Sequence, residues 1–337
     1  MLQSLTQKSA YFSMDNPYVQ LFSIYEIGKA FAKQGYTALF IDEVHHYKNW
    51  KPDTKALYDE YTNLTIVAYG SSPLALEAER RNDILEVEPL SLSEMYKLER
   101  GQKTGGTDWT NQQAVVEFLA KNPHLYDGYR RYIAGASFPI SLQYHEKTLQ
   151  AIYNSMQKSI REDAVFLPNV DGELIFAMEK TLVFLASAPV GEFSINSFCK
   201  LLELNKYKTY YMVSVLQDMK ILRLVRPAGR GAKLVRGEPK LLFYHPTMRK
   251  AVCEQLHLKA DVGAMREEAA VFALARLGWR VHTIKGMKKS SDYHVEKGKE
   301  EYVIEVGGES KGTGQLHEFG AKTMIIDERR IINMLCF

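Results

Sequence analysis

The sequence predicts an α/β protein that begins with a doubly wound parallel sheet and continues into helical and mixed modules. Three observations lead to this fold class. Strand-like and helix-like stretches alternate over the first 90 residues, the pattern turns helical from 90 to about 180, and helices and strands mix again beyond 172. The chain has 337 residues, which is room for more than one domain, since a domain takes about 100–200 residues.

The elements of the first 90 residues follow from their apolar spacing. Residues 11–14 are short and extended, Asn16-Pro17 interrupts them, and residues 18–34 carry apolar side chains at helical spacing until Gly35. Residues 37–41 form a continuous apolar run, which is typical of a strand buried on both faces of a parallel sheet. The same reasoning predicts the elements that follow: a helix over 53–61, a strand over 64–69, a helix over 73–80 and a strand over 83–87.

The remainder predicts a helical region and two further modules. From 90 to about 180 the pattern is helical, interrupted by polar loops at 101–107 and 135–139. A winged helix-turn-helix pattern follows, with helices over 172–186, 194–204 and 206–219, an extended stretch over 221–225, a glycine-rich basic loop and a strand over 241–244. A separate small α/β unit comes last, with a helix over 264–277 and strands near 280–284, 302–306 and 323–326.

Composition limits the classes of protein. Nothing approaches the ~18 consecutive apolar residues of a membrane helix, and the start lacks the apolar core of a signal peptide, so we expect a cytoplasmic protein without a membrane partner. Cys199, Cys253 and Cys336 are far apart and odd in number, which favours free thiols over disulfides or a zinc site. Residues 220–250 carry a net charge of +8 within a total of +3, which points to an anionic partner, nucleic acid first, with a solvated basic face as the alternative.

Two acids, Asp42 and Glu43, directly follow the first buried run. Ligands bind at the carboxyl ends of parallel strands, and in nucleotide hydrolases an acid there helps to hold Mg²⁺ while a neighbouring Glu orients or deprotonates the attacking water. Gly70-Ser71-Ser72 closes the next strand, where a small polar residue could contact a phosphate. The alternative is an incidental pair, because many strands end in exposed acids.

These residues carry a family resemblance. Ile41-Asp42-Glu43-Val44-His45, Ala68-Tyr69-Gly70-Ser71-Ser72-Pro73 and Pro89-Leu90-Ser91-Leu92-Ser93-Glu94 resemble the prokaryotic AAA-type ATPases of the P-loop superfamily. The C-terminal part resembles a winged helix followed by a restriction-endonuclease-like domain. The resemblance implies four domains: an ATPase-like core over 1–97, a helical lid over 98–170, a winged helix over 171–252 and a nuclease-like domain over 253–337.

The resemblance also implies site residues and cofactors. Asp42 would be the acid on the magnesium side, Glu43 the catalytic glutamate, and Ser71 or Ser72 the sensor. Arg80 or Arg81 would approach the γ-phosphate of ATP, from a neighbouring subunit if the chain forms a homo-oligomer. For the arginine pair a surface position at a helix end is an equal alternative, because helix C-termini favour cations. ATP and Mg²⁺ are the implied cofactors.

One element of the family is absent from the sequence. No Gly-x-x-x-x-Gly-Lys-[Ser/Thr] phosphate loop occurs, and Met1 stands where the family would have just completed its first strand, this loop and the first helix. We therefore expect either a truncated ATPase or a degenerate, non-hydrolysing DNA-binding or scaffold protein. In both cases these residues alone should bind ATP poorly.

His45 and His46 follow the acids. Adjacent side chains on a strand or loop point different ways, so the sequence disfavours this pair as the ligands of one metal ion. A histidine after Asp-Glu also occurs in helicase-like ATPases, where it couples the nucleotide site to the rest of the protein. The resemblance therefore favours His45 as a relay.

The winged-helix region predicts contacts with duplex DNA. The third helix would bring basic residues to base edges, and the wing would bring others to phosphates. The alternative is a packing module with solvated charges. The candidate residues are Lys206, Lys208, Arg223, Arg226, Arg230, Lys233 and Arg236.

The last module predicts a nuclease-like acid order without cleavage. Glu267 or Glu268, then Asp292 and Glu305, stand in the order of restriction-endonuclease-like folds, where acids hold a divalent ion. The lysine normally found two positions after the last acid is replaced by Gly307. Lys311 could substitute for it, but we expect the fold to persist without nuclease activity.

Overall fold

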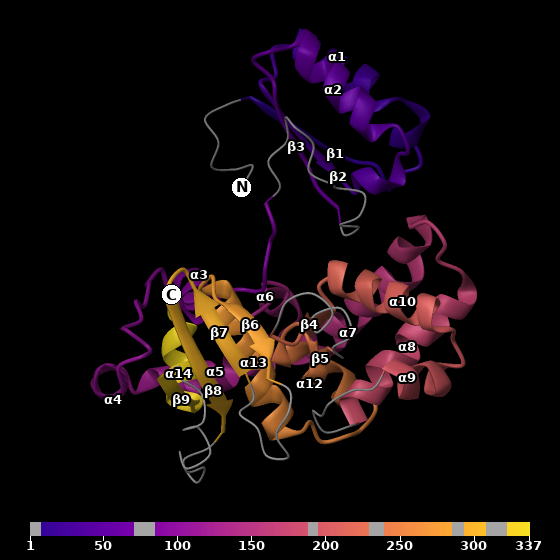
Figure 1. The fold of residues 1–337 in the computed structure, drawn as a ribbon. Helices are drawn as coiled ribbons and strands as arrows, with labels where there is room; N and C mark the ends of the chain where they lie inside the picture. Colours follow the sequence, from indigo (N-terminus) through magenta and orange to yellow (C-terminus); the bar gives the residue numbers. More distant parts are fainter. Residues whose placement is uncertain (1–7, 71–84, 188–194, 229–238, 285–292, 308–321) are drawn as a thin grey trace. The chain divides into compact units, whose positions relative to one another are not determined.

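The structure is a computed structural model that describes residues 8–70, 85–187, 195–228, 239–284, 293–307 and 322–337 (Figure 1). The chain divides into two compact units. One comprises Met1–Glu86 with Lys158–Asp171, and the other comprises Val87–Gln157 with Gly172–Phe337. Within the described residues, no helix is both long enough and apolar enough to cross a bilayer.

The first unit is built on a parallel sheet, as the sequence predicts. Its three strands, in spatial order, are β1 (Ser9–Ser13), β2 (Ala38–Asp42) and β3 (Thr65–Ala68). The helices α1 (Ile24–Lys33) and α2 (Trp50–Glu60) lie next to each other beside this sheet (Figure 1). Parallel pairing brings the carboxyl ends of all three strands to one edge, where Asp42 ends the middle strand.

The core of the first unit explains why this sheet forms. Leu39 and Ile41 on β2 are fully buried against Ile24 of α1 and Leu57 of α2. Gly28 permits the close approach, since a Cβ there would stand 2.4 Å from Leu57 Cδ1. Helix α1 begins later than the predicted residue 18, because the chain first makes the short turn η2 (Val19–Leu21) and a capping box of Ser23 and Glu26 then starts the helix.

A distant segment completes this unit. The turns η7 (Ser159–Asp163) and η8 (Ala164–Phe166) belong to it although more than 85 residues separate them from β3. The predicted helix over 73–80 and most of the predicted strand over 83–87 lie outside the described residues.

The second unit begins with helices, as predicted for this region. They are α3 (Leu92–Arg100), α4 (Gln112–Lys121), α5 (His124–Arg131), η5 (Tyr132–Ala136), α6 (Ser141–Tyr144), η6 (His145–Lys147) and α7 (Thr148–Lys158).

Three helices and a hairpin come next. They are α8 (Gly172–Ser187), α9 (Ile195–Leu202), α10 (Lys206–Asp218), β4 (Leu222–Val225) and β5 (Lys240–Phe243), and the two strands pair antiparallel. The elements agree with those expected for this stretch. Helix α12 (Pro246–Gln255) packs against α8 and was not predicted.

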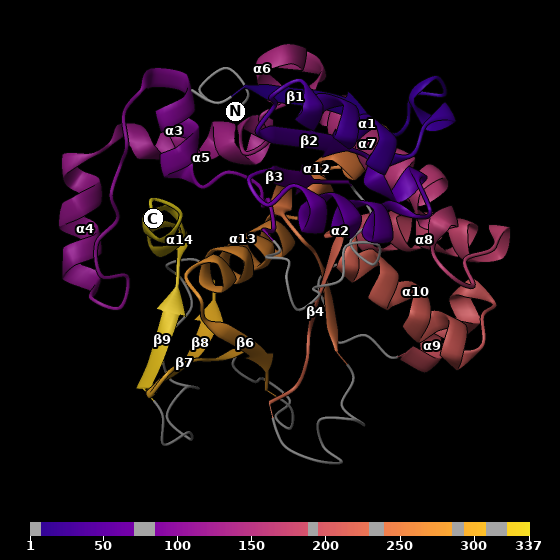
Figure 2. The same cartoon turned by 90° about the horizontal axis from the view of Figure 1, so that it is seen from above.

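The chain ends in a four-stranded sheet. Its elements are α13 (Val262–Arg276), β6 (Arg280–Thr283), β7 (Tyr293–Lys297), β8 (Glu300–Val306), β9 (Lys322–Ile326) and α14 (Glu328–Met334). The order is β6-β7-β8-β9, with β8 and β9 parallel and the other pairs antiparallel. Helix α13 packs along this sheet (Figure 2). The sequence did not predict strand β7 or helix α14.

This last part is bonded to the helical region that precedes it. The side chain of Asn333 donates to the carbonyl of Thr107 and accepts from its amide, both at 2.8 Å. Trp109 stacks edge-on with Trp279 and Tyr302. Contacts therefore group residues 87–157 and 172–337 into one unit, and the predicted four-domain division of the chain stays a prediction.

Candidate functional site

The candidate site lies where β2 ends. Ala38–Asp42 is buried except for Asp42, which is half-buried. Glu43 then takes the left-handed conformation (φ 48°, ψ 44°) and the chain turns into η3 (Val44–His46). A non-glycine residue in this region is strained, and such strain concentrates at functional sites. The predicted acids therefore stand at the expected strand end, on a strained bend.

Both carboxylate oxygens of Asp42 are engaged. Its Oδ1 accepts from the amide of Glu43 at 2.9 Å, and its Oδ2 accepts from the hydroxyl of Tyr11 on β1 at 2.7 Å. The hydrogen bond to this carboxylate raises the pKa of Tyr11 well above its ordinary value. Burial, and then Asp42, raise the pKa of Tyr69 as well. Tyr11 and Tyr69 were missed from the sequence, although the parallel register places β1 beside Asp42.

The end of β3 meets the same corner. The amide of Val44 donates to the carbonyl of Tyr69 at 3.2 Å. A Cβ on Gly70 would stand 2.7 Å from His45 Nδ1 and 3.6 Å from Glu43 Oε2, so only glycine fits there without movement. Tyr69 and Gly70, which follow β3, thus lie beside the bend that carries Glu43 and His45. Ser71, Ser72, Arg80 and Arg81 lie outside the described residues, and their roles stay predictions.

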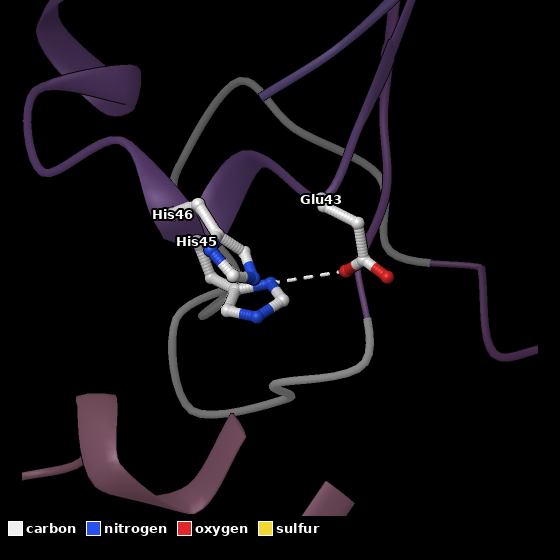
Figure 3. A group of neighbouring side chains, drawn as sticks. All are labelled: Glu43, His45 and His46. Carbon is white, nitrogen blue, oxygen red and sulfur yellow. Dashed lines mark ion pairs between the residues drawn. The ribbon is translucent and has the colours of Figure 1, made fainter. Parts of the chain in front are cut away.

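His45 and His46 lie side by side, contrary to the expectation that neighbouring histidines point different ways. Their ring centroids are 4.5 Å apart, and Figure 3 shows both rings beside Glu43. The expectation was based on strand geometry, whereas these residues occupy a 3-10 turn. Phe166 contacts both rings, with centroid distances of 5.5 Å to His45 and 4.8 Å to His46.

His45 is flanked by two carboxylates. Its Nδ1 is 3.4 Å from Glu43 Oε2, and its Nε2 is 3.7 Å from Asp163 Oδ1, which comes from η7. Neither the contact with Glu43 nor the contact with Asp163 has the distance and angles of a hydrogen bond. Among the described residues, both ring nitrogens of His45 and Oε2 of Glu43 are buried without a hydrogen-bond partner. The sequence carried no signal for Asp163, because it is 118 positions beyond His45.

The predicted DNA-contacting residues fall into four groups. Lys206 and Arg226 are exposed, whereas Lys208 pairs with Glu173. The guanidinium of Arg223 lies over the Tyr244 ring at 4.2 Å, and its Nε and Nη2 are buried. Outside the described residues are Arg230, Lys233 and Arg236. Arg223 is therefore packed within the unit rather than extended into solvent.

The predicted nuclease-like acids are not arranged as one open cluster in the described residues. Glu268 is fully buried and accepts from Nε and Nη2 of Arg249 at 2.8–3.0 Å and from the amide of Phe243 at 3.0 Å. Burial raises the pKa of Glu268 to about 7 despite the neighbouring guanidinium. Glu305 is half-buried on β8, and Asp292 lies outside the described residues. Glu268 thus serves an internal ion pair.

Glu267 is engaged as well. It accepts from Lys240 at 2.5 Å and from the Tyr293 hydroxyl at 2.9 Å. Both acids that the sequence offered on α13 therefore bond to protein groups.

The acid side of a Mg²⁺–nucleotide site fits these residues, and the phosphate side does not. Asp42 and Glu43 supply the carboxylates that such a site needs at a parallel strand end. A lysine and a glycine-rich loop that could cradle the β- and γ-phosphates are missing from the sequence.

One comparison with known proteins finds a match. Residues 1–96 match a family model described as an AAA domain. No curated protein and no solved structure matches the chain. The matched stretch contains β1 to β3 and the candidate site, whereas the helices and sheet of residues 97–337 lie outside it.

Proposed function

We propose that the AAA-like segment of residues 1–96 forms the acid-bearing half of an ATP-hydrolysing centre. Asp42 would act on the magnesium side, and Glu43 would polarise the attacking water. A single observation carries the proposal: the two acids follow the buried middle strand of a parallel sheet, inside the stretch that matches the AAA domain. Mg²⁺ would supply the charge that neutralises the phosphate oxygens.

The contacts of each acid suit its role. Tyr11 and the Glu43 amide hold the two oxygens of Asp42 in one orientation. Oε2 of Glu43 has no hydrogen-bond partner among the described residues, so it is able to accept a proton from water.

The phosphate-binding half is not contained in these 337 residues. Without the amide cradle and its lysine, most of the affinity for the β- and γ-phosphates is missing. We therefore expect the 337-residue chain to bind Mg-ATP more weakly than micromolar. Ser71 or Ser72 as sensor, and Arg80 or Arg81 at the γ-phosphate, belong to the same proposal.

The test has two steps. Calorimetry with Mg-ATP on the chain should show weak binding, and a micromolar dissociation constant would refute that expectation. The DNA upstream of the Met1 codon is then read for an in-frame strand followed by Gly-x-x-x-x-Gly-Lys-Thr. A longer product with that loop should hydrolyse ATP, and Glu43→Gln should slow it by about 10²–10⁴-fold. Hydrolysis that is insensitive to Glu43→Gln would refute the proposal.

We also propose that the α8–α10 and β4–β5 region binds duplex DNA. The supporting observation is the start of α10, where Lys206 is exposed beside Tyr207 (75% exposed) and Tyr210 (40% exposed). Exposed aromatic and basic residues at the N-terminus of a third helix suit contacts in the major groove. If this candidate holds without nucleotide hydrolysis, the protein is a degenerate, non-hydrolysing DNA-binding member.

A mobility-shift series on duplex DNA at rising salt tests the DNA proposal. Binding should weaken steeply with salt, since each phosphate contact releases a counterion. Lys206→Ala should weaken binding, whereas Lys121→Ala, an exposed lysine on α4, should not. No shift even at low ionic strength would refute the proposal.

A further inference from the structure

Three unsatisfied polar atoms gather at the end of β2. They are Nδ1 and Nε2 of His45 and Oε2 of Glu43, all buried without a hydrogen-bond partner among the described residues. The side chain of His45 is completely buried. A neutral imidazole carries one donor and one acceptor, and leaving both unmet in the interior costs free energy. A ligand bound between His45 and Glu43 would give these buried atoms the partner that they lack among the described residues.

The spacing of the donors suits a small ion. Glu43, His45 and His46 each offer one atom that could ligate a metal ion, and these three atoms lie within 4.8 Å of one another. Two ligand atoms at about 2.0–2.1 Å from a tetrahedral Zn²⁺ stand about 3.3 Å apart. Glu43 Oε2 and His45 Nδ1 are already 3.4 Å apart. His46 is half-buried on the same turn, and a ligand atom of its side chain lies within 4.8 Å of the other two.

We propose that Glu43, His45 and His46 bind a divalent transition-metal ion of the zinc class. Two imidazoles and one carboxylate are a ligand set for such ions, whereas Mg²⁺ prefers oxygen ligands. Three protein ligands leave a fourth position for water. The proposal does not rest on nucleotide hydrolysis. A bound ion would occupy the carboxylate of Glu43, so the metal-bound form and the form in which Glu43 acts as a base exclude each other.

Asp163 supplies the partner that a metal-binding histidine needs. A histidine that ligates a metal through one nitrogen usually donates its other N–H to a carboxylate, which fixes the tautomer. His45 Nε2 faces the buried Asp163 at 3.7 Å while Nδ1 faces Glu43. Ligation through Nδ1 and donation from Nε2 would satisfy both nitrogens. This role assigns a function to η7, which belongs to this unit although more than 85 residues of chain separate it from β3.

Gly70 keeps the ligand position open. A Cβ atom at this residue would lie 2.7 Å from His45 Nδ1 and 3.6 Å from Glu43 Oε2. The φ angle of Gly70 is not positive, so its backbone conformation is also open to alanine. Gly70→Ala should therefore obstruct metal binding without removing any ligand.

The full chain, freed of metal with a chelator, is titrated with Zn²⁺ in a competition assay. We expect one equivalent to bind at this site. His46→Gln and Gly70→Ala should each raise the dissociation constant by about 100-fold or more. Co²⁺ should give the absorption of a nitrogen- and oxygen-ligated tetrahedral ion. Circular dichroism verifies that each variant is folded.

Two matched controls separate this site from other metal-binding groups. His294→Gln removes a nitrogen from the His282–His294 pair on β6 and β7, whose rings are 6.4 Å apart. Gly105→Ala adds a methyl group in open space. Both should leave the affinity within about twofold. The proposal is overturned if the wild-type chain binds no Zn²⁺, if His46→Gln and Gly70→Ala bind it unchanged, or if Co²⁺ shows thiolate charge-transfer bands.

Discussion

Two buried histidines, His245 and His45, stand in opposite situations. Nδ1 of His245 accepts from the amide of Thr247 at 3.2 Å, and its Nε2 lies 3.0 Å from the hydroxyl of Tyr132, which in turn donates to the carbonyl of Leu90. Neither nitrogen of His45 has a hydrogen-bond partner in the described part of the chain. Both side chains are removed from solvent, so burial alone does not distinguish them.

The same contrast holds for two glutamates. Glu268 accepts four hydrogen-bond or ion-pair contacts within the second unit, mostly from Arg249. Glu43 has one buried oxygen without a hydrogen-bond partner among the described residues and sits on a strained bend. A fully bonded polar cluster stabilises a fold, whereas an incompletely bonded one is suited to a ligand. The sequence offered both glutamates as candidate site residues, Glu43 for catalysis and Glu268 within a nuclease-like acid order without cleavage, and only their surroundings tell them apart.

The largest expected effect is at the bonded cluster. Arg249→Met leaves Glu268 buried without its cation, so we expect the free energy of unfolding to fall by about 3–5 kcal/mol. Adding Glu268→Leu removes the stranded charge and should restore most of the loss. The control is Arg131→Met at the more exposed Glu99 pair, which should cost less than about 1 kcal/mol. Equal losses at both pairs, measured by urea denaturation, would contradict the contrast.

A smaller effect is expected from pH at His245. Burial, with Arg223 and Arg276 nearby, lowers the pKa of His245 from 6.5 to about 3. The unfolded chain therefore takes up the proton first, and stability falls as the pH drops from about 6.5 toward 3. By pH 5 this amounts to about 2 kcal/mol relative to pH 7.

The measurement is the difference in unfolding free energy between wild type and His245→Leu across this pH range. The variant lacks the titrating group, so the advantage of the wild type should shrink toward low pH. A difference that stays constant between pH 7 and pH 5 would rule out a neutral buried His245.

The smallest effect is expected at the unbonded cluster. Without metal at pH 7, His45→Leu should change the free energy of unfolding by less than about 1 kcal/mol, because it removes ring nitrogens that make no hydrogen bond to the described residues. His245→Leu should cost more, about 1–3 kcal/mol, since the Thr247 amide loses its acceptor. If thermal unfolding ranks the two variants the other way, His45 is bonded in the folded protein and the comparison fails.

Much of the first unit could be predicted from local patterns. The apolar run over 37–41 identified β2 because a strand buried on both faces has no polar positions. Strand β7 (Tyr293–Lys297) was missed although His294 and Glu296 alternate with Tyr293 and Val295, because two buried side chains are too short a pattern to identify a strand. Helix α1 was predicted too long, since the apolar spacing before Ser23 belongs to a short turn.

The sequence by itself determined that Asp42 and Glu43 stand at the end of a buried strand, with a glycine closing the next one. Hydrophobic periodicity acts over a few residues, so it places a side chain along its own element. Only the tertiary structure decided that Asp163 comes beside His45, and that Arg249 pairs with Glu268. Contacts between distant residues depend on how whole elements pack, and that packing determines which buried polar atoms are left for a ligand.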